Sequence, residues 1–171
     1  MFQEPLSLYK MIILHMLGRV DFPLTKAQVM NFVLEREYMS FLALQQAMGE
    51  LVDEHFMRVE TYGNRSHLLI TAEGLDTLSH LGHLVGAPMQ AEIDEFFRSA
   101  GLEMRNEVSV FAHYQKSGSG EFIAHLVAKD KDVKLVELSL SVPDEETAKE
   151  ICANWQLKHP DIYKYLVEAL F

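Results

Sequence analysis

Cysteine, long apolar runs and positive charge are all scarce in this sequence of 171 residues. Its one cysteine, Cys152, cannot form an internal disulfide, which favours a reducing compartment. Apolar runs reach only about four residues, as in Met11–Leu14, far short of the roughly 20 that a membrane-spanning helix needs. The first residues also lack a basic region followed by an apolar stretch, so we expect no signal peptide. These absences predict a soluble cytoplasmic protein with no membrane partner.

The charge balance weighs against nucleic-acid binding. The chain carries 15 Lys and Arg against 25 Asp and Glu, a formal net charge of −10. Most non-specific affinity for nucleic acid comes from cations that neutralise phosphates. An acidic chain can therefore bind DNA only through a local basic patch.

The common catalytic motifs are absent as well. The sequence has no G-x-S-x-G, no phosphate-binding P-loop and no G-x-G-x-x-G. The one glycine-rich stretch, residues 117–120, is expected to link two antiparallel strands, so it cannot hold phosphate at a helix N-terminus. Cys152 falls on an apolar helical stripe, which favours an inert buried thiol. We expect neither an enzyme nor a bound cofactor.

Residues 1–82 alternate helical patterns with one hairpin. A helix with a buried stripe around Ile12 and Ile13 is expected to end at Gly18. Thr25 and Gln28 predict a capping box at the start of a second helix. A fourth helix is expected over residues 72–81, capped by Thr71.

A third helix is predicted to begin at Ser40. Its expected inner face is Phe41, Leu44, Met48, Leu51 and Val52, and its expected outer face is Ala43, Gln46, Gly49, Glu50 and Asp53. Two strand-like runs follow, residues 57–62 and 67–71, around a hairpin tip at Gly63–Ser66. The order helix, helix, helix, hairpin, helix predicts a winged helix-turn-helix domain.

The rest of the chain changes period from about 3.6 to 2. Residues 83–107 are expected to connect two domains through a helix over residues 89–106, with Ile93, Phe96, Phe97 and Leu102 on its apolar side. Residues 108–171 then predict a three-stranded antiparallel meander over 108–115, 121–129 and 133–142. A helix opened by Asp144 and broken at His159-Pro160 is expected next, followed by a short apolar C-terminal helix. The predicted fold class is thus α+β, a winged helix followed by a small α+β domain for dimerisation or sensing.

In a winged helix the third helix enters the major groove of DNA and the hairpin reaches the backbone or minor groove. Polar and basic side chains at those places are the candidate DNA contacts: Lys26, Arg36, Ser40, Gln45, Gln46, Arg58, Tyr62, Asn64, Arg65 and His67. Glutamine can pair with adenine through two hydrogen bonds, and serine can bind phosphate. Residues 1–80 nevertheless hold six Lys and Arg against ten Asp and Glu, a net of −4, so affinity would depend on dimerisation and low salt.

Two functions from different classes remain open at this point. The first is a transcriptional regulator that reads a two-fold site of double-stranded DNA as a homodimer, with contacts through residues 89–106 and 166–171. The second is a protein–protein adaptor that keeps the winged-helix shape without phosphate contacts. A cluster of Lys26, Arg36, Arg58 and Arg65 on one face would favour the regulator.

Histidines and aromatic residues suggest two minor roles. His80 and His83, or His113 and His125 on neighbouring strands, could form part of a metal site, although isolated histidines are the better interpretation. The aromatic residues of the second half could line a pocket for a small-molecule effector. A domain of this size, however, needs most of its apolar side chains for its own core.

Several phrases of the sequence support a family resemblance. Residues 69–75 (Leu-Ile-Thr-Ala-Glu-Gly-Leu) resemble the segment after the wing in bacterial regulators of the multiple-antibiotic-resistance and phenolic-acid-decarboxylase repressor types. Together with residues 9–14, 140–143 and 148–155, they resemble over nearly the full length a bacterial family described only as domain of unknown function 4364. The resemblance implies a winged helix joined to a small α+β region and a transcriptional regulator, with no established ligand or target.

Overall fold

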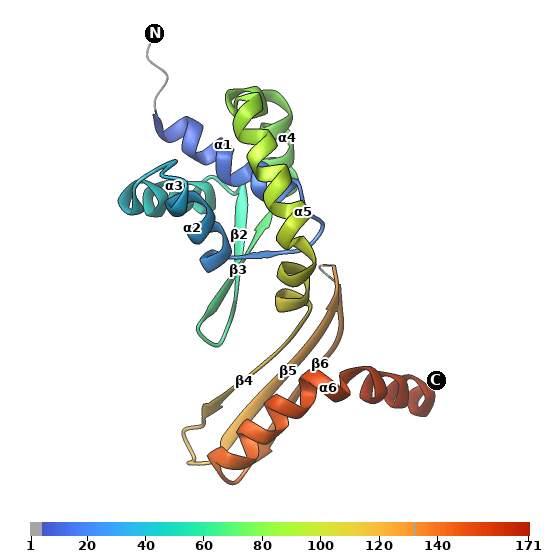
Figure 1. The fold of residues 1–171 in the computed structure, drawn as a ribbon. Coiled ribbons are helices and arrows are strands. Elements are labelled where there is room, and N and C mark those ends of the chain that lie inside the picture. The colour runs from blue at the N-terminus through green and yellow to red at the C-terminus, as the bar shows by residue number, and fades with distance from the viewer. Residues whose placement is uncertain (1–4, 132) are drawn as a thin grey trace. The chain divides into compact units, whose positions relative to one another are not determined.

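The computed structural model describes residues 5–131 and 133–171 and divides into two compact units, Met1–Arg105 and Asn106–Phe171. Figure 1 follows the chain through both. Each unit combines helices with a three-stranded antiparallel sheet, which agrees with the predicted α+β class.

The first unit begins with three helices and a short strand. Its elements in chain order are α1 (Pro5–Gly18), β1 (Leu24–Thr25), α2 (Lys26–Glu35), α3 (Phe41–Asp53), β2 (Met57–Tyr62), β3 (Arg65–Ile70), α4 (Ala72–Leu81), the 3-10 helix η1 (Gly82–Leu84) and most of α5 (Ala87–Ser109). The sheet has the order β1-β3-β2, so β3 is its central strand. The two-residue strand β1, which the sequence did not predict, pairs Leu24 with Leu68 and Thr25 with His67.

Local capping signals define the helix starts. Thr25 Oγ1 accepts a hydrogen bond from the Gln28 amide at 3.1 Å, and Gln28 Oε1 accepts one from the Thr25 amide at 2.8 Å. The predicted capping box is therefore confirmed. Ser40 and Thr71 cap α3 and α4 in the same way, as the sequence also predicted. Each cap satisfies a backbone donor that the first turn of the helix leaves without a partner.

Gly74 allows α4 to approach the chain that links α3 to β2. A Cβ atom at this position would lie 2.1 Å from the Phe56 carbonyl oxygen, which is far inside contact distance. The same oxygen accepts a hydrogen bond from the Thr71 amide at 3.1 Å, and the Thr71 hydroxyl donates to the His55 carbonyl at 2.6 Å. Only glycine fits between these backbone segments without moving them.

The apolar face of α5 differs from the prediction at one residue. Ile93 is fully buried, but Leu102 is 76% exposed. Leu102 follows Ile93 by nine residues, or about two and a half helical turns, so it lies on the opposite side of the helix. Met104, about three turns after Ile93, occupies the buried stripe instead and is only 5% exposed.

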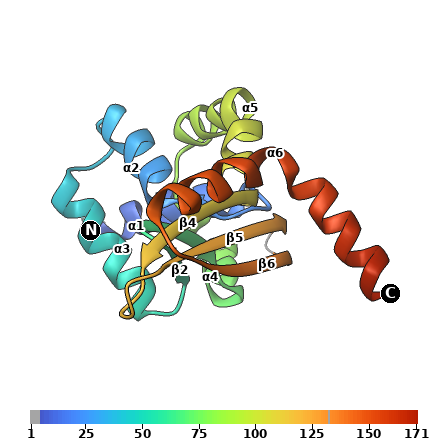
Figure 2. The same cartoon turned by 90° about the horizontal axis from the view of Figure 1, so that it is seen from below.

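The second unit is a meander covered by one helix. It holds β4 (Val110–Lys116), β5 (Phe122–Asp130), β6 (Val133–Val142) and α6 (Glu145–Leu170), and its sheet has the order β4-β5-β6. A buried cluster of Ala124, Leu126, Ala128 and Trp155 lies between the sheet and α6. The Trp155 indole N–H donates to the Val127 carbonyl at 3.0 Å, which fixes α6 on the sheet (Figure 2).

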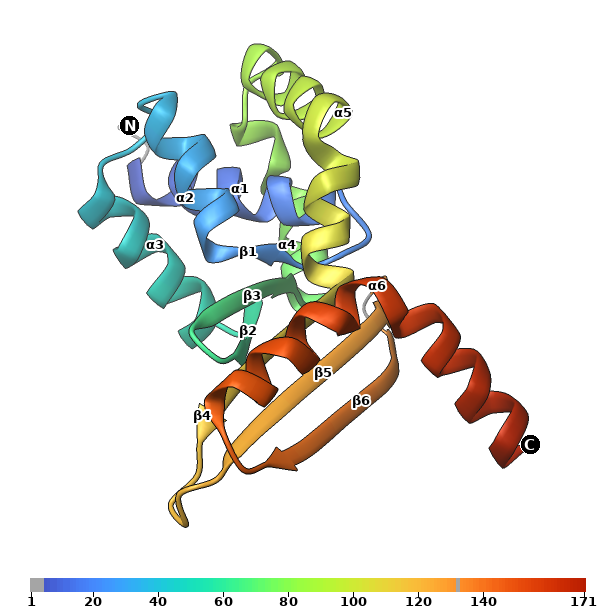
Figure 3. The ribbon, with the colours of Figure 1, turned by 60° about the horizontal axis from the view of Figure 1, so that its bottom comes forward.

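One helix, α6, replaces the two that the sequence predicted. It continues through His159-Pro160 to Leu170, so the expected break at Pro160 is wrong. A proline inside a helix removes one backbone donor and crowds the preceding turn, and these effects bend the helix when neighbouring turns hold it together. Figure 3 shows α6 changing direction about midway, after which its C-terminal half leaves the sheet on the side of β6.

Candidate nucleic-acid interface

The helix α3 carries the surface that the sequence assigned to DNA reading. Ser40 Oγ accepts a hydrogen bond from the Ala43 amide at 3.2 Å and fixes the start of the helix. Leu44, Ala47 and Leu51 are fully buried and Met48 nearly so, which holds the inner face of α3 against α1 and leaves Gln46 and Gly49 exposed.

Two residues expected on that inner face lie outside it. Phe41 is 50% exposed and Val52 is 37% exposed, so the prediction was wrong for both. Ala47, which was not predicted to be buried, is part of the buried stripe. The centre of this stripe therefore lies on a side of the helix away from Phe41 and Val52. Leu42, in the first turn, is 79% exposed. The N-terminal turn of α3 is therefore an apolar surface with no basic side chain of its own.

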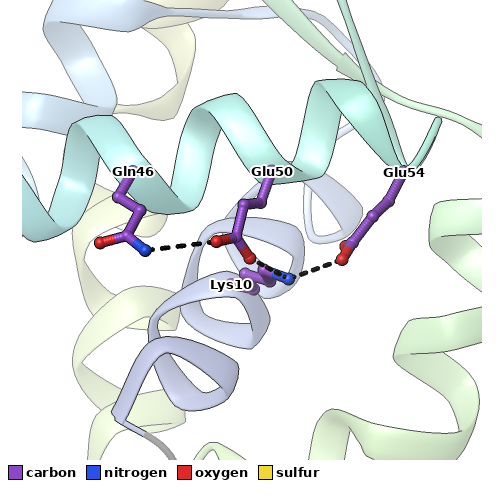
Figure 4. Close-up of polar contacts among 4 residues, drawn as sticks. All are labelled: Lys10, Gln46, Glu50 and Glu54. Carbon is purple, nitrogen blue, oxygen red and sulfur yellow. Dashed lines mark hydrogen bonds and ion pairs between the residues drawn. The ribbon is translucent and has the colours of Figure 1, made fainter.

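The C-terminal half of α3 is acidic and tied to α1. Lys10 Nζ lies 2.7 Å from Glu50 Oε2 and 2.8 Å from Glu54 Oε1, and the Gln46 amide donates to Glu50 Oε1 at 3.3 Å (Figure 4). Burial acts to lower the pKa of Lys10, but the hydrogen bonds and the attraction to the two carboxylates act in the opposite direction and are stronger together. The net effect is a raised pKa. The hydrogen bonds from Lys10 and Gln46 lower the pKa of Glu50. Two carboxylates thus face one ammonium, and this end of α3 repels phosphate.

Two of the candidate residues contact each other across α2 and α3. Lys26 Nζ donates to Gln45 Oε1 at 3.2 Å, and both side chains are half-buried. Gln45 therefore presents its amide group to Lys26, while Gln46, one residue on, is exposed. A base contact by Gln45 would require this hydrogen bond to break.

Arg36 points toward α5. Its guanidinium lies 4.0 Å from the centre of the Phe32 ring and 5.6 Å from that of Phe96, and Nε is 3.9 Å from Glu92 Oε2. The Tyr38 hydroxyl also donates to Glu92, and burial together with this carboxylate raises the pKa of Tyr38 to about 12. Arg36 is therefore partly neutralised by Glu92.

The β2–β3 hairpin carries two exposed arginines, Arg58 and Arg65. Gly63 and Asn64 form its two-residue tip, with φ of 62° at Gly63, and Tyr62 pairs with Arg65 across the strands. The expected four-residue tip at Gly63–Ser66 is therefore too long by two residues. Asn64 and Arg65 are exposed, as is Arg58, whose Nη2 lies 3.7 Å from Glu60 Oε1.

Tyr62 and His67 are the inward-facing candidates on this hairpin. The Tyr62 hydroxyl donates to Glu60 Oε2 at 2.9 Å, and its ring centre lies 5.0 Å from that of His67. His67 has no exposed surface, which contradicts its prediction as a DNA contact. As part of the central strand, it pairs with Thr25 of β1 and Glu60 of β2, and residues 67–69 are all buried.

Within the part of the chain that the structure describes, neither histidine pair has a third metal-ligating partner. His113 and His125 are directly opposite on β4 and β5, with ring centres 4.9 Å apart, and the Ser139 hydroxyl lies 2.9 Å from His125 Nδ1. His80 and His83 contact backbone carbonyls through Nδ1. Among residues 5–131 and 133–171, no group of three or more His, Cys, Asp or Glu could hold a metal ion.

Two other features bear on ligand chemistry. A cavity of about 710 Å³ opens in the first unit, lined by residues 18–22 with Phe97, Gly101, Leu102 and Arg105. Its two arginines are occupied, Arg105 by Asp21 at 2.6 Å and Arg19 by Asp94 at 2.7 Å. The sequence did not indicate the cavity, because its walls come from segments about 80 residues apart.

Burial raises the pKa of the half-buried Cys152 thiol, which disfavours the reactive thiolate.

Comparison with known proteins identifies the family and nothing finer. Within the described residues, no helix is both long and apolar enough to cross a bilayer. No curated protein and no solved structure matches the chain significantly. The model of a domain of unknown function, DUF4364, matches residues 9–170. The chain therefore belongs to the DUF4364 family.

Proposed function

We propose that this protein is a DNA-binding transcriptional regulator of the winged helix-turn-helix type, acting as a homodimer on a two-fold site. The observation that supports this most is the topology of the first unit. The order α1-β1-α2-α3-β2-β3-α4, with β3 central in the sheet, is the order of a winged helix, in which α3 reads the major groove and the β2–β3 hairpin is the wing.

The exposed residues of α3 and the hairpin suit those two roles. Gln46 is free of the core and can hydrogen-bond to a base edge, and the neighbouring Leu42 can pack on a thymine methyl group. Arg58 and Arg65 project from the hairpin, which extends beyond the helices of the first unit (Figure 1). These two arginines are the best placed cations for phosphate or minor-groove contact.

The electrostatics predict that one protomer binds DNA weakly and with a shallow salt dependence. Arg36 is paired with Glu92 and Lys10 with Glu50 and Glu54, so few cations remain for phosphates. Each phosphate contact adds to the slope of log K against log salt concentration, and a small number of contacts gives a shallow slope and low affinity. A two-fold dimer doubles the contacts on one DNA molecule, which is why the proposal includes one.

Fluorescence anisotropy with the DNA upstream of the protein's own gene tests the proposal. We expect affinity that falls as salt rises and that drops at least about tenfold in the Arg58→Ala/Arg65→Ala double variant. Arg98→Ala is the matched control, because Arg98 is also an exposed, ion-paired arginine of the first unit but lies on α5, where it pairs with Glu95. Absence of binding at about 50 mM salt, or equal binding by all three proteins, would contradict the proposal.

A protein-docking role for α3 is the second candidate, and one observation favours it. The exposed surface of α3 combines the apolar Phe41 and Leu42 with the acidic cluster of Glu50 and Glu54. Apolar residues next to carboxylates suit a basic amphipathic partner better than they suit a phosphate backbone. The substitution Leu42→Lys, described in the Discussion, separates the two roles.

A further inference from the structure

The outer edge of β6 is an open strand edge. Among the described residues β6 pairs only with β5, and nine of the ten residues of β6 have a partner there. Lys134 of β6 pairs with Lys129 of β5, and the next pair along the strands is Val136 with Ala128. Leu135 has no partner between them and is the extra residue of a bulge. Residues 136–142 are regular and contain no proline or lysine, the usual means by which proteins protect such an edge.

The C-terminal half of α6 presents a second open surface. Its apolar stripe continues from Trp155 through Ile162, which packs on the core, to Leu166 and Leu170. Leu170 is 76% exposed and Phe171 is fully exposed. This half of the helix extends outward past β6, as Figures 1 and 3 show, so both open surfaces lie on the same side of the second unit.

We propose that a second copy of this chain covers both surfaces. The two β6 strands pair antiparallel about a two-fold axis at Ser139, which joins the two sheets into one. The C-terminal half of each α6 then lies across the β6 strand of the partner. This interface goes beyond DNA binding and stands whether or not the first unit binds DNA.

The sequence of β6 is complementary to itself about Ser139. Residues 136–142 read Val-Glu-Leu-Ser-Leu-Ser-Val. The axis places Val136 opposite the partner's Val142 and Leu138 opposite the partner's Leu140. Glu137 faces the partner's Ser141, so no like charges are opposed, whereas an axis at Glu137 would oppose two carboxylates.

The same symmetry explains the exposure of Leu140. Val136 and Leu138 pack toward α6, and Leu140, on the same face, is 41% exposed. The two-fold axis brings the beginning of one β6 beside the end of the other. The overhanging half of the partner's α6, which leaves the sheet near the beginning of its own strand, then covers Leu140.

Sedimentation velocity of the full chain tests the interface. We expect the wild type to sediment as a dimer with twice the chain mass of 19.6 kDa. Leu170→Glu should raise the dimer dissociation constant at least about tenfold. Leu157→Glu is the matched control, because Leu157 is 80% exposed on the same helix and lies on its polar side, one turn before Asp161. A monomeric wild type, or equal dissociation constants for the two variants, would overturn the proposal.

A cross-link tests the register. In a Cys152→Ala background, Ser139→Cys should form a covalent dimer under mild oxidation with copper–phenanthroline, because its Cβ faces its own copy across the axis. Ser141→Cys is the matched control, since Ser141 is also exposed but faces the partner's Glu137 in the proposed register. Efficient cross-linking of Ser141→Cys, or of neither variant, would overturn the register at Ser139. The sedimentation and cross-linking experiments contain no DNA, so their outcomes are independent of the anisotropy test.

Discussion

The first unit buries large apolar side chains within itself, whereas the second has a much smaller core of its own. Ile12, Phe32 and Leu44 are almost completely removed from solvent in the first unit. In the second, the buried cluster beneath α6 consists of two alanines, Leu126 and Trp155, and Trp155 is its largest side chain. Hydrophobic stabilisation scales with apolar area buried, so a domain of 66 residues with such a core is marginal alone. The difference predicts that the second unit depends more on the proposed dimer for its stability than the first unit does.

The largest expected difference between the two units follows from substituting Trp155. Trp155→Ala should cost the second unit about 3–5 kcal/mol, because it empties the core and leaves the Val127 carbonyl without the indole donor. Differential scanning calorimetry of the full chain should show one transition shifted down and the other unchanged. Leu157→Ala, at an exposed position of the same helix, should change stability by less than about 0.5 kcal/mol. A single transition that moves as a whole would mean that the units do not unfold independently.

The first unit should be most sensitive where its backbone segments touch. Gly74→Ala should destabilise this unit by at least about 1–3 kcal/mol, because the new Cβ meets the Phe56 carbonyl oxygen. Gly49→Ala on α3 is the opposite case: nothing lies within 4 Å, so the helix should gain about 0.5–1 kcal/mol. Urea unfolding followed by circular dichroism measures both. Equal effects of the two substitutions would show that α4 can move away from Phe56.

The second unit should lose stability at low pH because of His113. Burial, with the nearby His125, lowers the pKa of His113 from its ordinary value of 6.5. The folded state thus favours the neutral imidazole, so its stabilising contribution is complete above pH 6.5 and is lost as the pH falls through the lowered pKa. We expect His113→Gln to reduce the loss of second-unit stability between about pH 8 and pH 5. Burial also lowers the pKa of His159, so the variant should still lose some stability as the pH falls.

The smallest expected effect separates the two roles of α3. Leu42→Lys replaces a side chain that is 79% exposed, so stability should change by less than about 0.5 kcal/mol. On a DNA-binding helix the added cation should raise affinity a few-fold and steepen its salt dependence. On a protein-docking surface the loss of an apolar contact should weaken binding instead. Anisotropy with DNA decides, and reduced affinity for DNA would contradict the groove position proposed for this turn.

Local signals predicted the starts of helices and the fold class, because the residues that carry them act over a few positions. Ser40, Thr71 and Asp144 cap α3, α4 and α6 as expected, and β6 has the predicted bounds. The strand β1 and the continuation of α6 through Pro160 were missed, because tertiary packing and not local preference decides them.

The candidate site was less predictable for the same reason. Lys10 precedes Glu50 by 40 residues, so the ion pair that makes one end of α3 acidic has no signature in the sequence. The burial of His67 follows from the central place of β3, which only the pairing with β1 reveals. Exposed polar residues of the hairpin tip, such as Asn64 and Arg65, were found because turns lie at the surface.

Trp155 is the only tryptophan of the chain, and it lies in the core of the second unit. Its fluorescence therefore reports on one half of the molecule. Emission should be blue-shifted while the indole is buried and should move to longer wavelength only when the second unit opens. The first unit is silent in this signal, so an intrinsic probe already separates the two halves without a label or a truncation. A change in tryptophan emission on adding DNA would then be a direct optical record of communication between them.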